Sequence, residues 1–299
     1  MDSPIEWPVK QRELIKWVTD SRVWNDFVMR DDDIVICTWS KSGTTWTQQI
    51  VGQLIFGGRP GLYHGAEASP WIDFRLRPEA RAIADAQTHR RFLKTHLPLD
   101  ALSYSPKAKY IYIGRDGRDV FWSWHKHWSS FKPEALAHIN SFYPDQPTIP
   151  YPDPDIRRAF LDWLDSDAYP NWPFWSHVQG WFDARRLPNL HLLHFANLKA
   201  DFENEVRRLA GFLDIAIAPE TWPKIVEQCS FDYVRGLAAP DPTQAVFLVG
   251  GGATFINKGT NGRWRDVLTE ADVARYLAEA ARHLTPDCAR WLATGELPA

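Results

Sequence analysis

The stretch ICTWSKSGTTWTQQIV, from Ile36 to Val51, changes character twice within a few residues. It begins as a β-branched apolar run, passes through a turn of small residues, and continues with apolar residues at helical spacing. A turn that enters a helix N-terminus offers unpaired N–H groups and a partial positive charge. Gly43 lets the backbone approach an anion, and Lys41 adds a full charge. Thr44 and Thr45 add hydroxyl donors. The turn therefore predicts a site for a phosphate-like anion, with an ordinary polar turn as the alternative for SKSG alone.

Three other runs share the strand-like composition of DIVICT near Ile34. They are RFLKTH near Phe92, KYIYIG near Tyr110 and LHLLHF near Leu192. Apolar residues at helical spacing follow in the segments Thr45 to Phe56, Val120 to Trp128, Trp175 to Arg185, Glu203 to Leu213 and Val273 to Leu284. This alternation predicts an α/β fold with a central parallel sheet flanked by helices. We expect a single domain spanning residues 1–299.

Two segments do not follow this pattern. Residues 129–173 contain eight prolines, which disfavour continuous helix or central strand, so we expect an irregular excursion over one end of the sheet. The glycine-rich run LVGGGATF, around Gly250 to Gly252, predicts a mobile turn.

Composition limits the possible functions. Lysine and arginine number 34 against 37 aspartate and glutamate, so overall charge gives no case for nucleic-acid or membrane partners. The N-terminal MDSPIEWPVKQRELIKW lacks the apolar core of a signal peptide or a membrane span. Cys37, Cys229 and Cys288 have neither disulfide-framework nor zinc spacing, which favours a reducing cytoplasm.

Polar residues follow the other expected strands as well. FLKTHLPL places Lys94 and His96 at the end of the second strand, and YIGRDGRDVFWSW places Arg115 and Ser123 where the third strand becomes a helix. Ser123 lies about two helical turns beyond Arg115, so the two share a ligand only if the chain bends between them. Near the C-terminus, FINKGTNGRWRDVLT presents Lys258 in a flexible glycine-containing loop. In open α/β sheets, ligands bind at the carboxyl ends of the strands, so these groups are expected to converge.

Four motifs resemble those of the cytosolic sulfotransferases and occur in the same order as in that family, whose members use 3'-phosphoadenosine 5'-phosphosulfate (PAPS) as donor. They are TWSKSGTTW, KTHLP, RDGRDVFWSW and KGTNGRW. FWSHVQGWFDARRLPNLHLLHFANLK resembles the helix and strand between the last two, so the resemblance spans about Ile34 to Thr269. It implies the P-loop-like sulfotransferase fold, and we expect a bacterial member of the family.

The resemblance also implies roles for individual residues. The 5'-phosphosulfate would be held by Lys41, Ser42, Gly43, Thr44 and Thr45. Lys41 would also neutralise the leaving oxygen, Lys94 would support charge on the sulfuryl group, and His96 would accept the proton of the attacking hydroxyl.

For the rest of the donor, the resemblance implies adenine stacking by Trp46 and Phe231. The 3'-phosphate would be bound by Arg115, Ser123, Lys258 and Gly259.

Several positions depart from the family pattern. Asn257 stands where the family often has arginine, which removes one cation from the 3'-phosphate site. Phe195 stands where a tyrosine usually meets the adenine edge, and it lacks the hydroxyl. Arg263 replaces a usual acidic residue and would restore a charge if it pointed toward the nucleotide. The family's dimer motif is incomplete around Arg265, Thr269, Glu270 and Ala274, so no dimer is carried over and the oligomeric state stays open.

Sulfuryl transfer requires in-line geometry and compensation of charge on the leaving and peripheral oxygens, which Lys41 and the loop amides would provide. The sulfuryl group carries less charge than a terminal phosphoryl group, so we expect no metal. A P-loop kinase is the main alternative, but its lysine follows the second glycine and precedes Ser/Thr, unlike Lys41. A non-catalytic nucleotide sensor is the other alternative, and it would need no base at His96.

The acceptor is expected to lie between His96 and the excursion, which is rich in aromatic residues and carries seven acidic residues against three basic ones. This surface favours a small, largely apolar molecule with one hydroxyl over an anionic polysaccharide. The aromatic residues expected to line it are Phe131, Phe142, Tyr143, Tyr151, Phe160, Trp163, Tyr169 and Trp172. Packing of these side chains onto the sheet is the alternative for any one of them.

Overall fold

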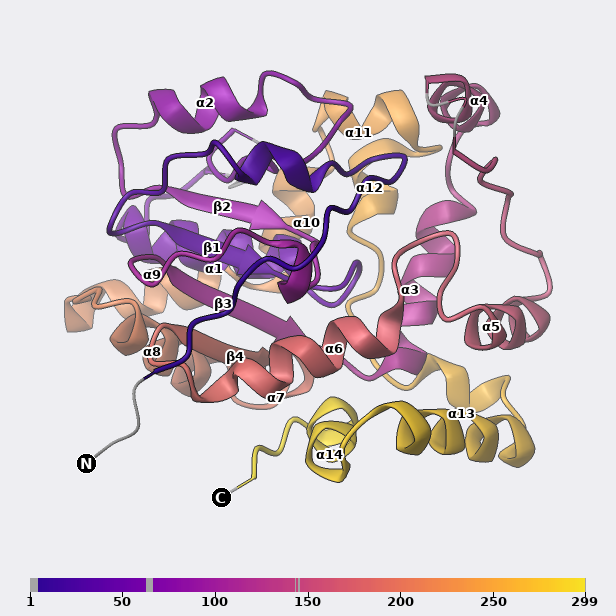
Figure 1. Ribbon diagram of the computed structural model, residues 1–299. Coiled ribbons are helices and arrows are strands. Elements are labelled where there is room, and N and C mark those ends of the chain that lie inside the picture. Colours follow the sequence, from indigo (N-terminus) through magenta and orange to yellow (C-terminus); the bar gives the residue numbers. More distant parts are fainter. Residues whose placement is uncertain (1–4, 63–66, 143, 145, 299) are drawn as a thin grey trace.

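A computed structural model describes residues 5–62, 67–142, 144 and 146–298 of the chain. Four parallel strands form one sheet in the order β2-β1-β3-β4. They are β1 (Ile34–Cys37), β2 (Phe92–Thr95), β3 (Lys109–Gly114) and β4 (Leu190–His194), which confirms all four predicted strands and the α/β fold class. A parallel sheet needs crossover connections, and α-helices lie in those from β1 to β2 and from β3 to β4, whereas the fully described one from β2 to β3 contains only the 3₁₀ helix Leu99–Ala101 (Figure 1).

The helices occupy most of the remaining chain (Figure 1). They are α1 (Thr44–Ile55), α2 (Ala80–Ala86), α3 (Gly117–Trp128), α4 (Pro133–Phe142), α5 (Ile156–Asp165), α6 (Phe174–Asp183), α7 (Phe195–Ala200), α8 (Phe202–Phe212), α9 (Trp222–Gln228), α10 (Phe231–Ala238), α11 (Pro242–Phe247), α12 (Gly251–Phe255), α13 (Glu270–His283) and α14 (Pro286–Thr294). The five predicted helical segments correspond to α1, α3, α6, α8 and α13. Short 3₁₀ helices occur at Ser21–Trp24, Leu99–Ala101, Ala184–Arg186, Pro219–Thr221 and Arg263–Asp266.

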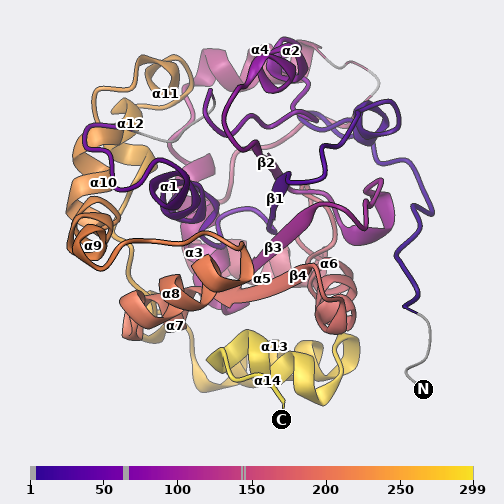
Figure 2. The same ribbon diagram turned by 90° about the vertical axis from the view of Figure 1, so that its left-hand side faces the viewer.

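Both faces of the sheet are buried. Side chains alternate along β1, so that Ile34 and Ile36 face one hydrophobic cluster while Val35 and Cys37 face the other. The first cluster packs against α1, α7, α8 and α9, which Figure 2 shows on one side of the strands. The second packs against α3, α5, α6 and the C-terminal helices. This double burial explains why the strands are continuous apolar runs.

The expectation of an irregular excursion at residues 129–173 is wrong in part, because α4 and α5 lie within it. Pro133 occupies the first position of α4, where a missing N–H and a fixed φ are tolerated. Asp155 caps α5 by accepting hydrogen bonds from the N–H groups of Arg157 and Arg158. The prolines therefore flank or begin helices instead of excluding them.

The expected turn at 250–252 is found only at Gly250, because Gly251 and Gly252 belong to α12. Gly250 adopts a left-handed conformation with φ 79° and caps α12, while Gly251 and Gly252 are buried. A Cβ at Gly252 would lie 1.7 Å from the carbonyl oxygen of Ala238 in α10. Glycine is therefore required there for close packing between α10 and α12.

The strands point toward α3, α10 and α12, which lie beyond their carboxyl ends (Figure 1). Loops that leave these ends carry the residues that the sequence predicts for the site.

Candidate functional site

The connection between β1 and α1 has a backbone that only certain residues permit. Lys41 has φ 69° and Gly43 has φ 130°. A Cβ at Gly43 would lie 2.8 Å from Ile113 and 3.0 Å from Phe195, so a larger residue would displace the turn. The turn delivers the chain into the twelve-residue helix α1, whose first turn contains no acidic residue. Its N–H groups and helix dipole favour an anion.

Lys41 lies in this turn without an acidic partner among the described residues. Its Nζ lies 4.6 Å from the centroid of the Phe255 ring. Burial, followed by the neighbouring charges of Lys94 and Arg115, lowers the pKa of Lys41 to about 7. A bound anion would offset this repulsion and favour the charged amine.

His96 follows β2, and its ring is held by Thr38, which follows β1. Its Nδ1 donates a hydrogen bond to the carbonyl oxygen of Thr38 at 2.8 Å, which leaves the Nε2 atom of the neutral ring with a free electron pair. Burial and the charge of Lys94 hold the pKa of His96 well below its usual range, so the neutral form predominates. Trp71 packs edge-on against the ring at 4.8 Å, and Trp172 stacks at 5.9 Å. The geometry suits a proton acceptor.

Hydrogen bonds on both sides fix the position of His96. Thr38 Oγ1 lies 2.7 Å from Thr44 Oγ1 and 3.0 Å from His96 Nδ1, which links the base to the first turn of α1. The carbonyl oxygen of His96 accepts a hydrogen bond from His177 Nε2 at 3.1 Å. His177 Nδ1 in turn lies 3.1 Å from the hydroxyl of Tyr112, on β3. These contacts connect His96 to α1 through Thr38 and Thr44, and to α6 and β3 through His177 and Tyr112.

Lys94 is the last but one residue of β2, and its Nζ lies 4.5 Å from the centroid of the Trp71 ring. Burial lowers the pKa of Lys94 to about 8, while the negative charge of Asp73 acts in the opposite direction. Two lysines with lowered pKa values, Lys41 and Lys94, therefore lie close to His96.

Arg115 lies between β3 and α3, where it faces the C-terminal loop. Its Nε donates to Asn261 Oδ1 at 3.0 Å, and its Nη2 donates to the carbonyl oxygen of Thr260 at 3.1 Å. Its guanidinium lies 4.2 Å from the centroid of the Phe195 ring. Burial lowers the pKa of Arg115 to about 10, and the charge of Arg263 contributes in the same direction. The negative charges of Asp119 and Asp116 act in the opposite direction, so Arg115 lies near two carboxylates as well as near Arg263.

The C-terminal loop is anchored on the same helix. Gly262 N–H donates to Asp119 Oδ1 at 2.6 Å, and Asp119 lies in the first turn of α3. Arg115 and Ser123 both line the same cavity.

Aromatic rings surround the part of the cavity near α1. Trp46 Nε1 donates to the carbonyl oxygen of Cys229 at 2.8 Å, and Phe202 stacks on the indole at 5.6 Å. Phe231 lies against Gly259, where a Cβ would lie 2.6 Å from the ring. Gly259 has φ 60°, so both its conformation and its contact with Phe231 favour glycine.

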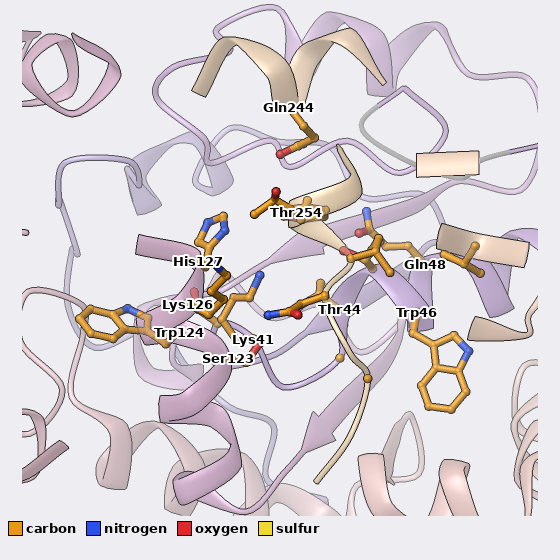
Figure 3. Close-up of a pocket in the computed structure, with 18 of the residues that line it drawn as sticks. Lys41, Thr44, Trp46, Gln48, Ser123, Trp124, Lys126, His127, Gln244 and Thr254 are labelled. Carbon is orange, nitrogen blue, oxygen red and sulfur yellow. The ribbon is translucent and has the colours of Figure 1, made fainter. Parts of the chain in front are cut away.

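Residues from all of these loops line one cavity of about 910 Å³ (Figure 3). The predicted residues along it are Lys41, Gly43, Thr44, Thr45, Trp46, Lys94, His96, Arg115, Ser123, Phe195, Phe231, Asn257, Lys258 and Gly259. Ser42 is the exception, since its side chain is buried and its N–H donates to the carbonyl oxygen of Trp39. The structure therefore brings together residues from every predicted motif.

The aromatic residues of segment 129–173 divide into separate groups. Phe131 and Trp172 line the cavity. Phe160 and Trp163 pack in the hydrophobic core, and Tyr151 and Tyr169 are exposed. Tyr143 lies outside the described residues. The expectation that this segment lines the cavity is thus met by only a few of its aromatic side chains.

Sequence reasoning missed several residues that shape the cavity. Trp71 and Phe255 contact the two lysines, and Thr38 orients His96. Thr38 lies within the quoted stretch and is the first residue of the motif TWSKSGTTW, which was a usable signal. The contacts of Trp71 and Phe255 depend on tertiary packing and left no local pattern.

Thr269, from the incomplete dimer motif, has a role within the chain. It caps α13 through a capping box with Asp272.

Among the residues that the structure describes, no group of three or more His, Cys, Asp or Glu side chains is placed to hold a metal ion. Within the same ranges, no helix has the length and apolar character needed to cross a membrane. All three cysteines are buried with free thiols.

Comparison with known proteins identifies the family. The chain is 32% identical to a glycolipid sulfotransferase of Mycobacterium bovis, with 97% of both chains covered. It is 28% identical to sulfotransferase 1A1 of Rattus norvegicus, with 94% of both chains covered. Its fold resembles that of retinol dehydratase solved with androsterone and adenosine 3',5'-bisphosphate (PAP). The TM-score is 0.70 at 20% identity, and the match covers 89% of this chain and 84% of the other. It also resembles a mouse sulfotransferase solved with PAP, with a TM-score of 0.66, 22% identity, and 91% and 90% covered. The sulfotransferase domain family matches residues 31–287, and the chain therefore belongs to that family.

Proposed function

We propose that this sulfotransferase moves the sulfuryl group from PAPS to a hydroxyl of a small, largely apolar acceptor, with His96 as general base. The observation that carries the proposal is the position of His96. Its Nδ1 is committed to Thr38, and Lys41 and Lys94 lie close enough to affect its pKa. The neutral imidazole can accept a proton, and the negative charge of a bound donor would offset the two cations that otherwise disfavour the imidazolium.

The donor would contact the residues that the sequence predicts for it. The turn of Lys41, Ser42 and Gly43 with the hydroxyls of Thr44 and Thr45 would bind the 5'-phosphosulfate, with Ser42 contributing through the backbone turn. Trp46, Phe195 and Phe231 would contact the adenine. Arg115, Ser123, Asn257, Lys258 and Gly259 would surround the 3'-phosphate.

In the transfer step, the acceptor oxygen forms a bond to sulfur while the bond from sulfur to the 5'-phosphate oxygen breaks. The hydroxyl proton passes to Nε2 of His96. Lys41 stabilises the negative charge that develops on the departing phosphate oxygen, and Lys94 offsets charge on the peripheral sulfuryl oxygens. The products are the sulfated acceptor and PAP.

The acceptor would occupy the part of the cavity walled by Trp71, Phe131 and Trp172. Apolar and aromatic walls favour a molecule that is largely apolar around its hydroxyl. The mycobacterial relatives named glycolipid sulfotransferases support a lipid-like acceptor. The free thiols of the three cysteines support a cytoplasmic location.

The proposal is tested by nucleotide selectivity and by turnover. PAP at about 100 times its dissociation constant should add roughly 2.7 kcal/mol of apparent stability, and ADP should add less at the same concentration. With PAPS supplied, release of PAP should depend on small phenols or alcohols and should be slight with heparan-type polymers. Equal stabilisation by ADP and PAP, or a need for Mg²⁺, would favour the kinase alternative. Turnover confined to polymers would leave the donor assignment and remove the acceptor assignment.

We expect Arg263 to compensate for Asn257 at the 3'-phosphate. Arg263 lines the cavity and lowers the pKa of Arg115, which places its charge near that guanidinium. Arg263→Ala should weaken PAP binding about tenfold, the scale of a hydrogen bond to a charged group, and change ADP binding little. Calorimetric titration of both nucleotides measures this difference.

Arg265→Ala is a matched control, because the Arg265 guanidinium stacks 4.6 Å from the Trp264 ring. Equal losses of PAP affinity in both variants would show that Arg263 has no specific role. Restoration of PAP affinity by adding Asn257→Arg to Arg263→Ala would support compensation.

A further inference from the structure

The cavity has a group of polar side chains that the donor and the transfer step leave without a role. Lys126 and His127 come from α3, Gln244 from α11 and Thr254 from α12 (Figure 3). We call these four residues the polar wall. None of the four side chains has a hydrogen bond or ion pair with another described residue. A polar wall without internal partners, in a cavity otherwise rich in aromatic rings, indicates a polar group on the ligand.

His127 lies close enough to Lys41 and Lys94 to be affected by their charges. Its half-buried ring packs edge-on against Phe131 at 5.2 Å and Phe255 at 5.7 Å. The Phe255 ring also contacts Lys41, because the Nζ atom of Lys41 lies 4.6 Å from the centroid of that ring. One phenyl ring therefore separates His127 from the lysine of the anion-binding turn. An acceptor whose hydroxyl meets His96 would extend past this ring.

The charges around the wall limit what it can bind. Burial, followed by the charges of Lys41 and Lys94, holds the pKa of His127 well below its usual range, so the ring is neutral. A neutral imidazole offers one N–H donor and one acceptor nitrogen, and the Gln244 amide likewise offers both. Lys41, Lys94 and Lys126 disfavour a cationic substituent. The rings of Phe131 and Phe255 beside His127 make burial of an unpaired charge costly, and the anionic donor proposed at Lys41 repels a second anion. The fitting partner is an uncharged oxygen.

We infer that the acceptor carries, besides the hydroxyl that is sulfated, a second uncharged oxygen of the carbonyl or hydroxyl type that hydrogen-bonds to His127, with Gln244 beside it. This inference rests on the proposed function and narrows its acceptor class. A site built to hydrogen-bond such an oxygen discriminates against analogues that lack it, because its own polar groups then lose their solvation without gaining a partner.

Matched acceptors with a single hydroxyl test the inference. One pair is 6-acetyl-2-naphthol and 6-ethyl-2-naphthol. The second pair is the corresponding 7-substituted isomers, which place the acetyl or ethyl group at a different distance from the hydroxyl. Release of PAP from PAPS gives kcat/KM for each, and the acetyl-to-ethyl ratio is compared between wild type and His127→Phe. Intrinsic differences in phenol reactivity cancel in this comparison. For at least one isomer pair, the ratio should fall about three- to tenfold in His127→Phe, as for loss of one neutral hydrogen bond.

His127→Gln, which keeps a donor and an acceptor, should retain most of the wild-type ratio, and Gln244→Leu should lower it. Calorimetric titration with PAP shows whether each variant is folded and binds donor. An unchanged ratio in His127→Phe for every isomer pair overturns the inference. So does a loss of PAP affinity greater than about tenfold, which would assign His127 to the donor. Absence of any PAP release from PAPS in the wild type would instead reject the proposed function.

Discussion

Replacing His96 with alanine is expected to lower kcat by about 10² to 10⁴, the usual contribution of a positioned general base. PAP should still bind, because His96 contacts Thr38, Trp71 and Trp172 and lies outside the residues proposed for the nucleotide. Steady-state assays with PAPS and a small phenol measure the first quantity, and calorimetric titration with PAP measures the second.

The two measurements separate catalysis from structure. Loss of PAP binding in His96→Ala would show that the residue maintains the fold of the loop, since its ring is hydrogen-bonded to Thr38. Turnover at the wild-type rate would reject the base assignment. Thr38→Val offers an independent check, because it removes the side-chain link to Thr44 while keeping the carbonyl that fixes the tautomer.

Replacing Lys41 with methionine is expected to lower kcat by about 10² to 10³, similar to removing one donor from a charge-stabilising site. The same variant should change the pH dependence of PAP binding. Burial lowers the pKa of Lys41 to about 7, and only the protonated amine attracts the nucleotide, so wild-type affinity should fall as the pH rises above about 7.

In Lys41→Met, PAP affinity should be lower, and its fall between about pH 7 and 8 should be smaller than in the wild type, since the charge of Lys41 is gone. Lys199→Met is the matched control, because Lys199 also lines the cavity and lies outside the anion-binding turn. That control should keep the wild-type pH dependence. A Lys41→Met variant that titrates like the wild type would assign the dependence to another group, such as Lys94.

The sheet and the turn between β1 and α1 were predictable because each is encoded by a local pattern. The four strands are short apolar runs whose two faces are both buried, so neighbours in sequence suffice to identify them. Lys41 and Gly43 adopt left-handed or unusual backbone angles in a turn whose composition already indicated one. The resemblance of four motifs then identified the family.

The remaining features depend on residues that are distant in sequence. The hydrogen bond that sets the tautomer of His96 joins it to Thr38, which is 58 residues away. The proline-rich composition of residues 129–173 hid α4 and α5, because proline at a helix start is favourable while proline inside a helix is not. His127 resembles any helical histidine until α3 is packed against Phe131 and Phe255.

Residues 231–263 supply walls to both halves of the cavity, with Phe231 and Gly259 on one side and Gln244 and Thr254 on the other. This continuous segment is also joined to the chain after α3, because Lys132 N–H donates to the carbonyl oxygen of Phe247 and Val249 N–H donates to that of Ser130. A ligand that ordered the segment at one end would alter the backbone that the other ligand meets. Thermodynamic linkage then requires reciprocity: whatever factor the nucleotide imposes on the affinity for the acceptor, the acceptor imposes on the affinity for the nucleotide.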